Sequence, residues 1–203
     1  MMAFRTAKYI LGFALAVPLL MAVSGAGTFS RFDALLAEAG LRLADMGELH
    51  EIETPANPLY DFEKSYKHPQ QSLEIRYAIR PIKRMVIDYN DPHNSAPKPD
   101  HMFPLVFQTL IGHFSSNGHV ATREYDPVKA KELFNADWAA AAMFNTDPEL
   151  NSSYSSAMLL AIHKSHQGDA YTLFLFDDAR AIKGEIDRLV NRLQFTKADT
   201  PSK

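Results

Sequence analysis

The sequence of 203 residues contains no cysteine. This absence excludes thiol nucleophiles, thiolate metal sites and disulfide exchange from the chemistry open to the protein. The sequence also lacks a phosphate-binding loop, a dinucleotide-binding glycine fingerprint, an HExxH zinc motif, an EF-hand loop and a G-x-S-x-G serine elbow. The motif-defined nucleotide-binding, metalloprotease and serine-hydrolase classes are therefore not indicated, and no cofactor is predicted.

Basic residues are neither in excess nor gathered into a long run. The chain carries 21 Lys and Arg against 24 Asp and Glu, a formal net charge of −3. An acidic chain of this kind is poorly suited to the phosphate backbone of nucleic acids, so no nucleic-acid partner is expected. The composition, 46% hydrophobic and 22% charged, is typical of a globular protein, and the length fits a single domain.

The N-terminal segment has the pattern of a secretory signal peptide. Arg5 and Lys8 precede residues 9–23, which contain no charged side chain, and small residues follow at 24–27. A basic start, a short apolar stretch and small residues before the cut are the three parts of such a peptide. We expect cleavage after Ala26 and a periplasmic or secreted protein, which the absence of cysteine also fits.

The alternative for this segment is an uncleaved membrane anchor. Its uncharged run covers 15 residues and contains Pro18, whereas a membrane-spanning helix needs about 20 apolar residues. No other stretch of the sequence is long and apolar enough to span a membrane. Cleavage after Ala26 removes two basic residues and no acid, which leaves 19 basic and 24 acidic residues and a net charge of −5.

Hydrophobic periodicity separates the rest of the chain into strands and helices. Apolar residues occupy every second position from Leu73 to Ile79, which predicts a strand with one buried and one solvent-exposed face. Strands are expected over residues 59–67, 72–80, 138–146, 157–164 and 171–177. Helices are expected over residues 31–46, from Asp100 to Asn117-Gly118, from Asp126 and from Asp178.

This order of elements indicates an α+β fold, in which an antiparallel sheet of about five strands is packed by helices. The strands at 157–164 and 171–177 are apolar on both faces, so we expect them at the covered centre of the sheet. The expected division of the chain is a signal peptide at 1–26, a helix and linker at 27–58, a single α+β domain at 59–195 and a flexible tail at 196–203.

The element order also resembles that of the PsbP-like and DcrB-like extracytoplasmic proteins. The segments that carry the resemblance are SLEIRYAIRPI at 72–82, HMFPLVFQTLIGHF at 101–114, SAMLLAIHKS at 156–165, AYTLFLFDD at 170–178 and the closing helix. The resemblance implies a compact sandwich of strands and helices. It also implies an accessory or binding protein without a catalytic apparatus, and it transfers no functional residue to this chain.

A loop rich in carboxylates and imidazoles is the first candidate site. Asp91 and His93 stand near Asp100 and His101, and both side-chain types are ligands for zinc-like divalent metals. The spacing matches no established metal motif. The alternative is that both Asp residues belong to turns or helix caps and both His residues are solvated.

A group of basic residues is the second candidate site. Arg76 and Arg80 fall on the same predicted solvent-exposed strand face, and Lys83 and Arg84 follow the Pro81 bend. Arginine is suited to bidentate contact with a carboxylate or phosphate, so the group could bind an anion. The alternative is a solvated sheet face whose charge is balanced by the neighbouring acids Asp61, Glu63 and Glu74.

Two further patterns are weaker. His163 and His166 lie at a strand end and its turn, where residues three apart point in opposite directions, so we expect packed or hydrogen-bonded histidines and no shared metal. Ser115 and Ser116 lie outside any strand-to-helix elbow, so a serine hydrolase rests on composition alone. The 13 Phe and 8 Tyr are expected to fill the core.

The sequence therefore favours an exported, non-catalytic envelope protein that binds another protein or a small molecule, without a membrane span after cleavage. The first alternative is a metal-assisted hydrolase that uses the loop from Asp91 to His101. The second is an anion-binding module built on Arg76 and Arg80.

Overall fold

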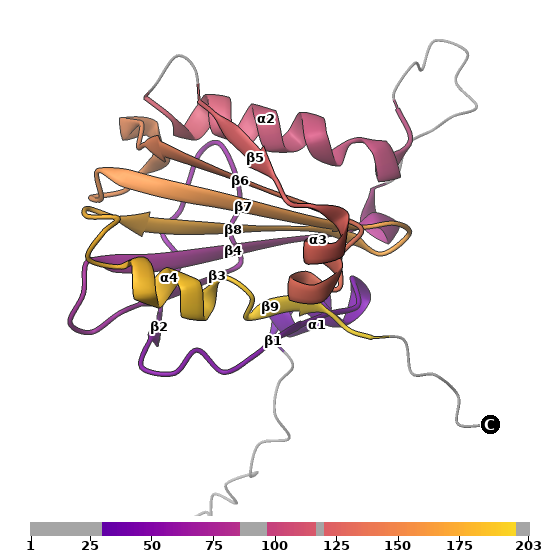
Figure 1. The fold of residues 1–203 in the computed structure, drawn as a ribbon, viewed down its shortest axis with the longest axis horizontal. Coiled ribbons are helices and arrows are strands. Elements are labelled where there is room, and N and C mark those ends of the chain that lie inside the picture. The colour runs from indigo at the N-terminus through magenta and orange to yellow at the C-terminus, as the bar shows by residue number, and fades with distance from the viewer. Residues whose placement is uncertain (1–29, 86–96, 117–119, 198–203) are drawn as a thin grey trace, which may run out of the picture.

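The computed structural model describes residues 30–85, 97–116 and 120–197. Within them, seven strands form one antiparallel sheet in the order β2-β3-β4-β8-β7-β6-β5, and β1 and β9 form a separate two-stranded ribbon (Figure 1). The strands are β1 Leu41–Leu43, β2 His50–Ile52, β3 Lys64–Lys67, β4 Leu73–Pro81, β5 Thr122–Glu124, β6 Trp138–Asn145, β7 Ser156–Lys164, β8 Gly168–Phe176 and β9 Leu193–Phe195.

Helices cover both faces of this sheet. They are α1 Arg31–Glu38, α2 Phe103–Phe114, α3 Pro127–Phe134 and α4 Lys183–Leu189, with 3-10 turns η1 Ile82–Arg84, η2 Pro99–His101 and η3 Pro148–Leu150. Figure 1 shows α2 along one face and α3 and α4 on the other. The α+β expectation is confirmed, but the expected number of strands is too low.

The strands that the sequence did not predict are too short to show a hydrophobic pattern. Both outer strands of the sheet, β2 and β5, have three residues each, and every residue of β5 is exposed. Three residues are too few to show an alternation of apolar and polar positions. Because β2 pairs with β3, the stretch expected to be a linker supplies one edge of the main sheet.

The core consists of two apolar clusters, one on each face of the sheet. Ile75, Tyr77 and Ile79 of β4 belong to the first cluster, which also contains residues of α1, α3, α4 and the β1–β9 ribbon. Ala78 of β4 belongs to the second, together with Phe107 of α2 and residues near Phe62. Residues of β4 therefore contact a covering layer on both faces of the sheet, as expected for a central strand.

The prediction of a solvent-exposed face on β4 is wrong. Glu74 and Arg76 are buried, and only Arg80 in that row is partly exposed. The polar and apolar residues of β4 do point to opposite faces of the sheet, as predicted. The polar residues are nevertheless buried, because α2 and the segment before β3 cover their face. A buried ion pair and a solvated pair produce the same sequence pattern.

Capping residues and a glycine explain where the helices α1 and α3 begin and where α1 ends. The Ser30 hydroxyl accepts a hydrogen bond from the Asp33 backbone N–H, and the Asp33 carboxylate accepts one from Ser30, so the predicted capping box is confirmed. The predicted length of α1 is wrong, because the helix ends at Glu38 and Gly40 turns the chain at φ +64°. Asp126 caps α3 as expected, with Pro127 in its first turn.

The last helix begins later than predicted, at Lys183 and not at Asp178. It ends at Leu189, and Leu193 and Phe195 belong to the strand β9, which pairs with β1. Over the described ranges, no helix has both the length and the hydropathy that crossing a bilayer requires. The predicted signal peptide and the tail beyond Lys197 lie outside the described residues.

Candidate functional site

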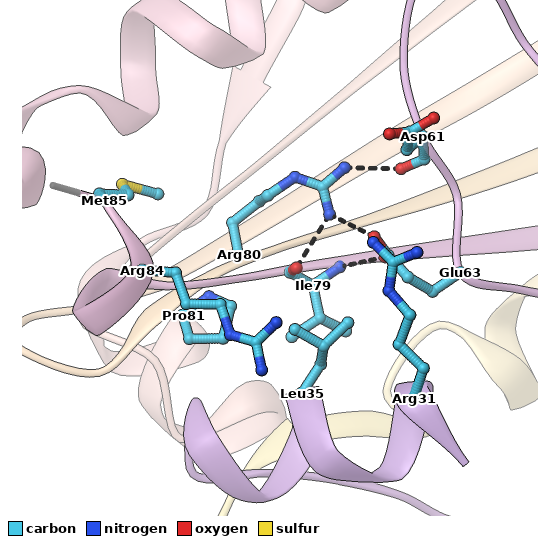
Figure 2. A pocket seen from close by; sticks show the side chains of 9 residues that line it. All are labelled: Arg31, Leu35, Asp61, Glu63, Ile79, Arg80, Pro81, Arg84 and Met85. Atoms are coloured by element: carbon cyan, nitrogen blue, oxygen red, sulfur yellow. Dashed lines mark hydrogen bonds and ion pairs between the residues drawn. The ribbon is translucent and has the colours of Figure 1, made fainter.

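A hollow of about 260 Å³ opens where α1, the segment before β3, the end of β4 and the η1 turn meet. Figure 2 shows that its side chains come from segments far apart in the sequence. They are Arg31, Leu35, Asp61, Glu63, Ile79, Arg80, Pro81, Arg84 and Met85. Leu35 and Ile79 belong to the apolar core, so the hollow has an apolar floor beneath charged walls.

Arg80 is held in a fixed position by four contacts. One terminal nitrogen of its guanidinium lies 2.7 Å from a Glu63 carboxylate oxygen and 2.9 Å from the Ile79 carbonyl oxygen. The other donates a hydrogen bond of 2.6 Å to the Asp61 carbonyl oxygen. The guanidinium carbon also lies 4.5 Å from the centroid of the Tyr60 ring, a cation–π contact.

Glu63 serves to hold this arginine in place. Its Oε1 atom pairs with Arg80, and its Oε2 atom accepts a hydrogen bond of 2.9 Å from the Ile79 backbone N–H. Its side chain is 6% exposed. Because both carboxylate oxygens are occupied, Glu63 is poorly placed to act as a general base.

The other two arginines of the hollow differ in their pairing. The Arg84 guanidinium donates a hydrogen bond to Glu38 of α1 at 2.7 Å, and this bond lowers the pKa of the Glu38 carboxyl. Arg31 has neither an ion pair nor a hydrogen bond from its side chain to any described residue. Figure 2 shows Arg31 on α1, and both Arg31 and Glu63 line the hollow.

Guanidinium groups outnumber carboxylates among the residues that line the hollow. Three guanidinium groups face Asp61 and Glu63, both Glu63 oxygens are already used, and Glu38, outside the lining, pairs with Arg84. A guanidinium offers up to five N–H donors in a planar fork that matches carboxylate and phosphate oxygens. The arrangement is therefore suited to binding a small anion.

The structure divides the predicted basic group between separate places. Arg80 and Arg84 both line the hollow, and Lys83 is exposed on η1 beside it. Arg76 is 2% exposed and lies inside the protein, where its guanidinium pairs with Glu74 at 2.7 Å and donates to the Asn151 carbonyl oxygen at 3.2 Å. No local pattern includes Arg31 in this group, because α1 reaches the hollow only through tertiary packing.

The predicted metal loop is only partly described. Asp91 and His93 lie outside the described residues. Asp100 does not cap α2, which begins without a side-chain cap; its carboxylate accepts a hydrogen bond from the His166 backbone N–H and contacts His166 Nδ1, both at 2.8 Å. His101 is exposed on η2, and the described parts of the chain contain no group of three potential metal ligands.

His163 is a buried histidine, as the sequence predicted. Its Nδ1 atom lies 2.7 Å from Oδ1 of Asp169, and its ring stacks on Phe103 with 4.0 Å between centroids. Burial raises the pKa of the Asp169 carboxyl, whose second oxygen has no hydrogen-bond partner among the described residues. His166 is exposed and contacts Asp100, so the two histidine side chains have different partners.

Comparison with known proteins adds no relative. Neither a scan against protein-family models nor a search of curated protein sequences gave a match for this chain. The resemblance to PsbP-like and DcrB-like proteins therefore stays a prediction, and the function has to be argued from the geometry of the hollow.

Proposed function

We propose that this protein is a non-catalytic binding protein whose ligand is a small anion, held in the hollow by Arg31, Arg80 and Arg84. The observation that carries the proposal is Arg31, whose guanidinium lines the hollow without a hydrogen bond or ion pair to any described residue. A carboxylate or phosphate group of the ligand would supply that partner.

The three arginines have different tasks in this proposal. Arg80 is held rigidly by Glu63 and two backbone carbonyl groups, so it presents its remaining donor capacity at little entropic cost. Arg84 is half exposed and is tied only to Glu38, so it can turn toward a ligand. Leu35 and Ile79 would contact a short apolar part of the same ligand.

The hollow limits the size of that ligand. A volume of about 260 Å³ is below the roughly 300–1,000 Å³ typical of pockets for drug-sized molecules. A dicarboxylate, a short phosphate ester or a comparable metabolite fits this range better than a peptide or a nucleotide. Succinate and inorganic phosphate are therefore suitable first probes.

Titration calorimetry of the purified chain with succinate and with phosphate tests the proposal. We expect binding that weakens as salt is raised, because the contacts are ionic. Arg31→Gln should weaken binding about tenfold or more, the effect of losing one charge-assisted hydrogen bond of about 1.5–3 kcal/mol. Arg123→Gln is the matched control, since Arg123 is exposed on β5 and does not line the hollow.

Two results would contradict the proposal. One is the absence of binding by any probe in a panel of small carboxylates and phosphates at low salt. The other is an equal loss of affinity in Arg31→Gln and Arg123→Gln, because that result would assign the effect to net charge and not to the hollow.

Export through the signal peptide is the second part of the proposal. Its support is the sequence of residues 1–26, and the accessory role implied by the PsbP-like resemblance agrees with it. Mass spectrometry of the protein recovered from its host tests this part. A polypeptide that begins at Gly27 is expected, and retention of residues 1–26 would indicate an anchored protein.

A further inference from the structure

A second hollow lies between the C-terminal end of α3 and the β1–β9 ribbon. Its volume is about 330 Å³, and none of its lining residues belongs to the hollow described above. Arg42 contributes from β1, Lys131 and Glu132 from α3, and Lys197 from the segment after β9.

The charges that line this second hollow are poorly balanced. Three cations, Arg42, Lys131 and Lys197, face one carboxylate, Glu132. The hydrogen bond of the Arg42 guanidinium goes to a neutral acceptor, the Gln194 amide oxygen, at 2.9 Å. Lys131 Nζ lies 3.7 Å from an Asp137 carboxylate oxygen, a contact at the outer limit of an ion pair.

A fourth cation stands next to these three. Lys164 Nζ lies 3.5 Å from the Thr196 carbonyl oxygen and 5.7 Å from the centroid of the Phe195 ring, and both residues line the hollow. Burial and the nearby charge of Lys131 lower the pKa of the Lys164 ammonium. Positive charge is thus concentrated here in a chain that carries an acidic excess overall.

The backbone walls of the second hollow are well fixed. Asn135 ends α3 in the left-handed conformation, at φ 50°, and its side-chain amide donates to the carbonyl oxygens of Phe195 and Thr196 at 3.2 and 2.8 Å. Thr196 in turn donates to the Gly40 carbonyl oxygen from both its backbone N–H and its hydroxyl. A hydrogen-bonded backbone frame therefore carries the long cationic side chains of this hollow.

We infer that this second hollow binds the phosphate group of a ligand that carries two or more negative charges. Lysine ammonium groups bind phosphate oxygens as point charges, and Arg42 adds a planar pair of donors. An ion with a single negative charge would neutralise only one of these cations, and the others would still repel one another. The phosphate could belong to a soluble metabolite or to an anionic lipid headgroup, which share this chemistry.

Pyrophosphate is the probe for the first experiment, followed by amide NMR of the full chain. The side-chain amide signals of Asn135 and Gln194 report directly on the second hollow. We expect both to shift on titration at low salt, with an affinity that falls about tenfold or more in the Arg42→Gln/Lys131→Gln double variant. Lys129→Gln/Arg123→Gln removes the same charge at exposed positions outside this hollow and should leave the affinity within about twofold.

A vesicle arm of the same experiment identifies the source of the phosphate. Sedimentation with phosphatidylcholine vesicles that contain phosphatidylglycerol, lost in Arg42→Gln/Lys131→Gln, would assign the site to a lipid headgroup. Binding of pyrophosphate without sedimentation would assign it to a soluble ligand.

The inference would be overturned if neither probe bound, or if both double variants lost affinity equally. The Arg31→Gln variant separates the two hollows. It should leave pyrophosphate binding at the second hollow unchanged even where it abolishes anion binding at the first. The two proposals can therefore fail independently.

Discussion

The two faces of the seven-stranded sheet are both covered, but only one of them buries charged side chains from the strands. The face toward α1, α3 and α4 consists of apolar residues such as Ile75, Leu160 and Phe174. The face toward α2 contains a buried ion pair, Glu74–Arg76, and a buried contact between His163 and Asp169. The apolar face thus derives its stability from burial, whereas the α2 face also depends on the pairing of its charges.

The largest expected effect is on the apolar face. Phe174 is fully buried in β8, so Phe174→Ala should lower the free energy of unfolding by about 3–5 kcal/mol through lost burial and the cavity left behind. Urea unfolding followed by circular dichroism measures the change. A loss below about 1 kcal/mol would contradict the assignment of this residue to the core.

The next effect tests the Glu74–Arg76 pair on the α2 face. Arg76→Met should cost about 3 kcal/mol, because it leaves the Glu74 carboxylate buried and unpaired. The double change Arg76→Met/Glu74→Leu should recover most of that loss, since an apolar pair of similar volume requires no desolvation of charge. Equal losses in the single and double variants would show that the packing of Arg76, and not its charge, is what matters.

A smaller effect concerns the pH dependence of the His163–Asp169 pair. Burial raises the pKa of Asp169 in the folded protein, so its contribution to stability is full at low pH and is lost as the pH rises from about 4 through the folded-state pKa. The free energy of unfolding of Asp169→Asn minus that of the wild type should therefore increase over this range. Glu38 and Asp177, whose pKa values are lowered, act in the opposite direction and cancel in the difference.

Urea titrations of both proteins at a series of pH values measure this difference. An Asp169→Asn curve that runs parallel to the wild-type curve at every pH would show that the carboxylate does not titrate differently in the folded state. Asparagine keeps an oxygen that can accept from His163, which limits the change to the charge.

The smallest expected effect lies at the edge of the apolar face, in the cap of α1. Ser30→Ala removes the hydroxyl that accepts from the Asp33 backbone N–H and should cost about 1 kcal/mol. Thermal or urea unfolding measures it, with Ser30→Thr as the control that keeps a capping oxygen. Loss of the same size in Ser30→Thr would indicate that the hydroxyl does not stabilise the helix.

The difference between the two faces also explains which parts of the fold could be predicted. The strands β7 and β8 are predictable because each contains an apolar run that covers both faces, residues 157–162 in β7 and 173–176 in β8. The strand β4 was found but assigned a solvent-exposed face, because Glu74 and Arg76 alternate with apolar residues whether they are solvated or paired. The strands β1, β2, β5 and β9 have three residues each and were missed.

The candidate site was predicted only where its residues are close in sequence. Arg80 and Arg84 stand on one strand and the turn after it, and both line the first hollow. Arg31 joins them only because α1 packs against β4, and a helix predicted from sequence carries no information about where it packs. Arg31, on which the proposed function rests, therefore could not be predicted from local sequence patterns.

The pairing of β1 with β9 determines when this fold can be completed. Leu41 lies opposite Phe195, so the ribbon joins residues near the two ends of the described chain. During synthesis, the partner of β1 is available only after β9 has left the ribosome, and contacts this distant in sequence form slowly. The nascent chain can pair β3 with β4 well before that point, but it remains without this ribbon until β9 has been synthesised.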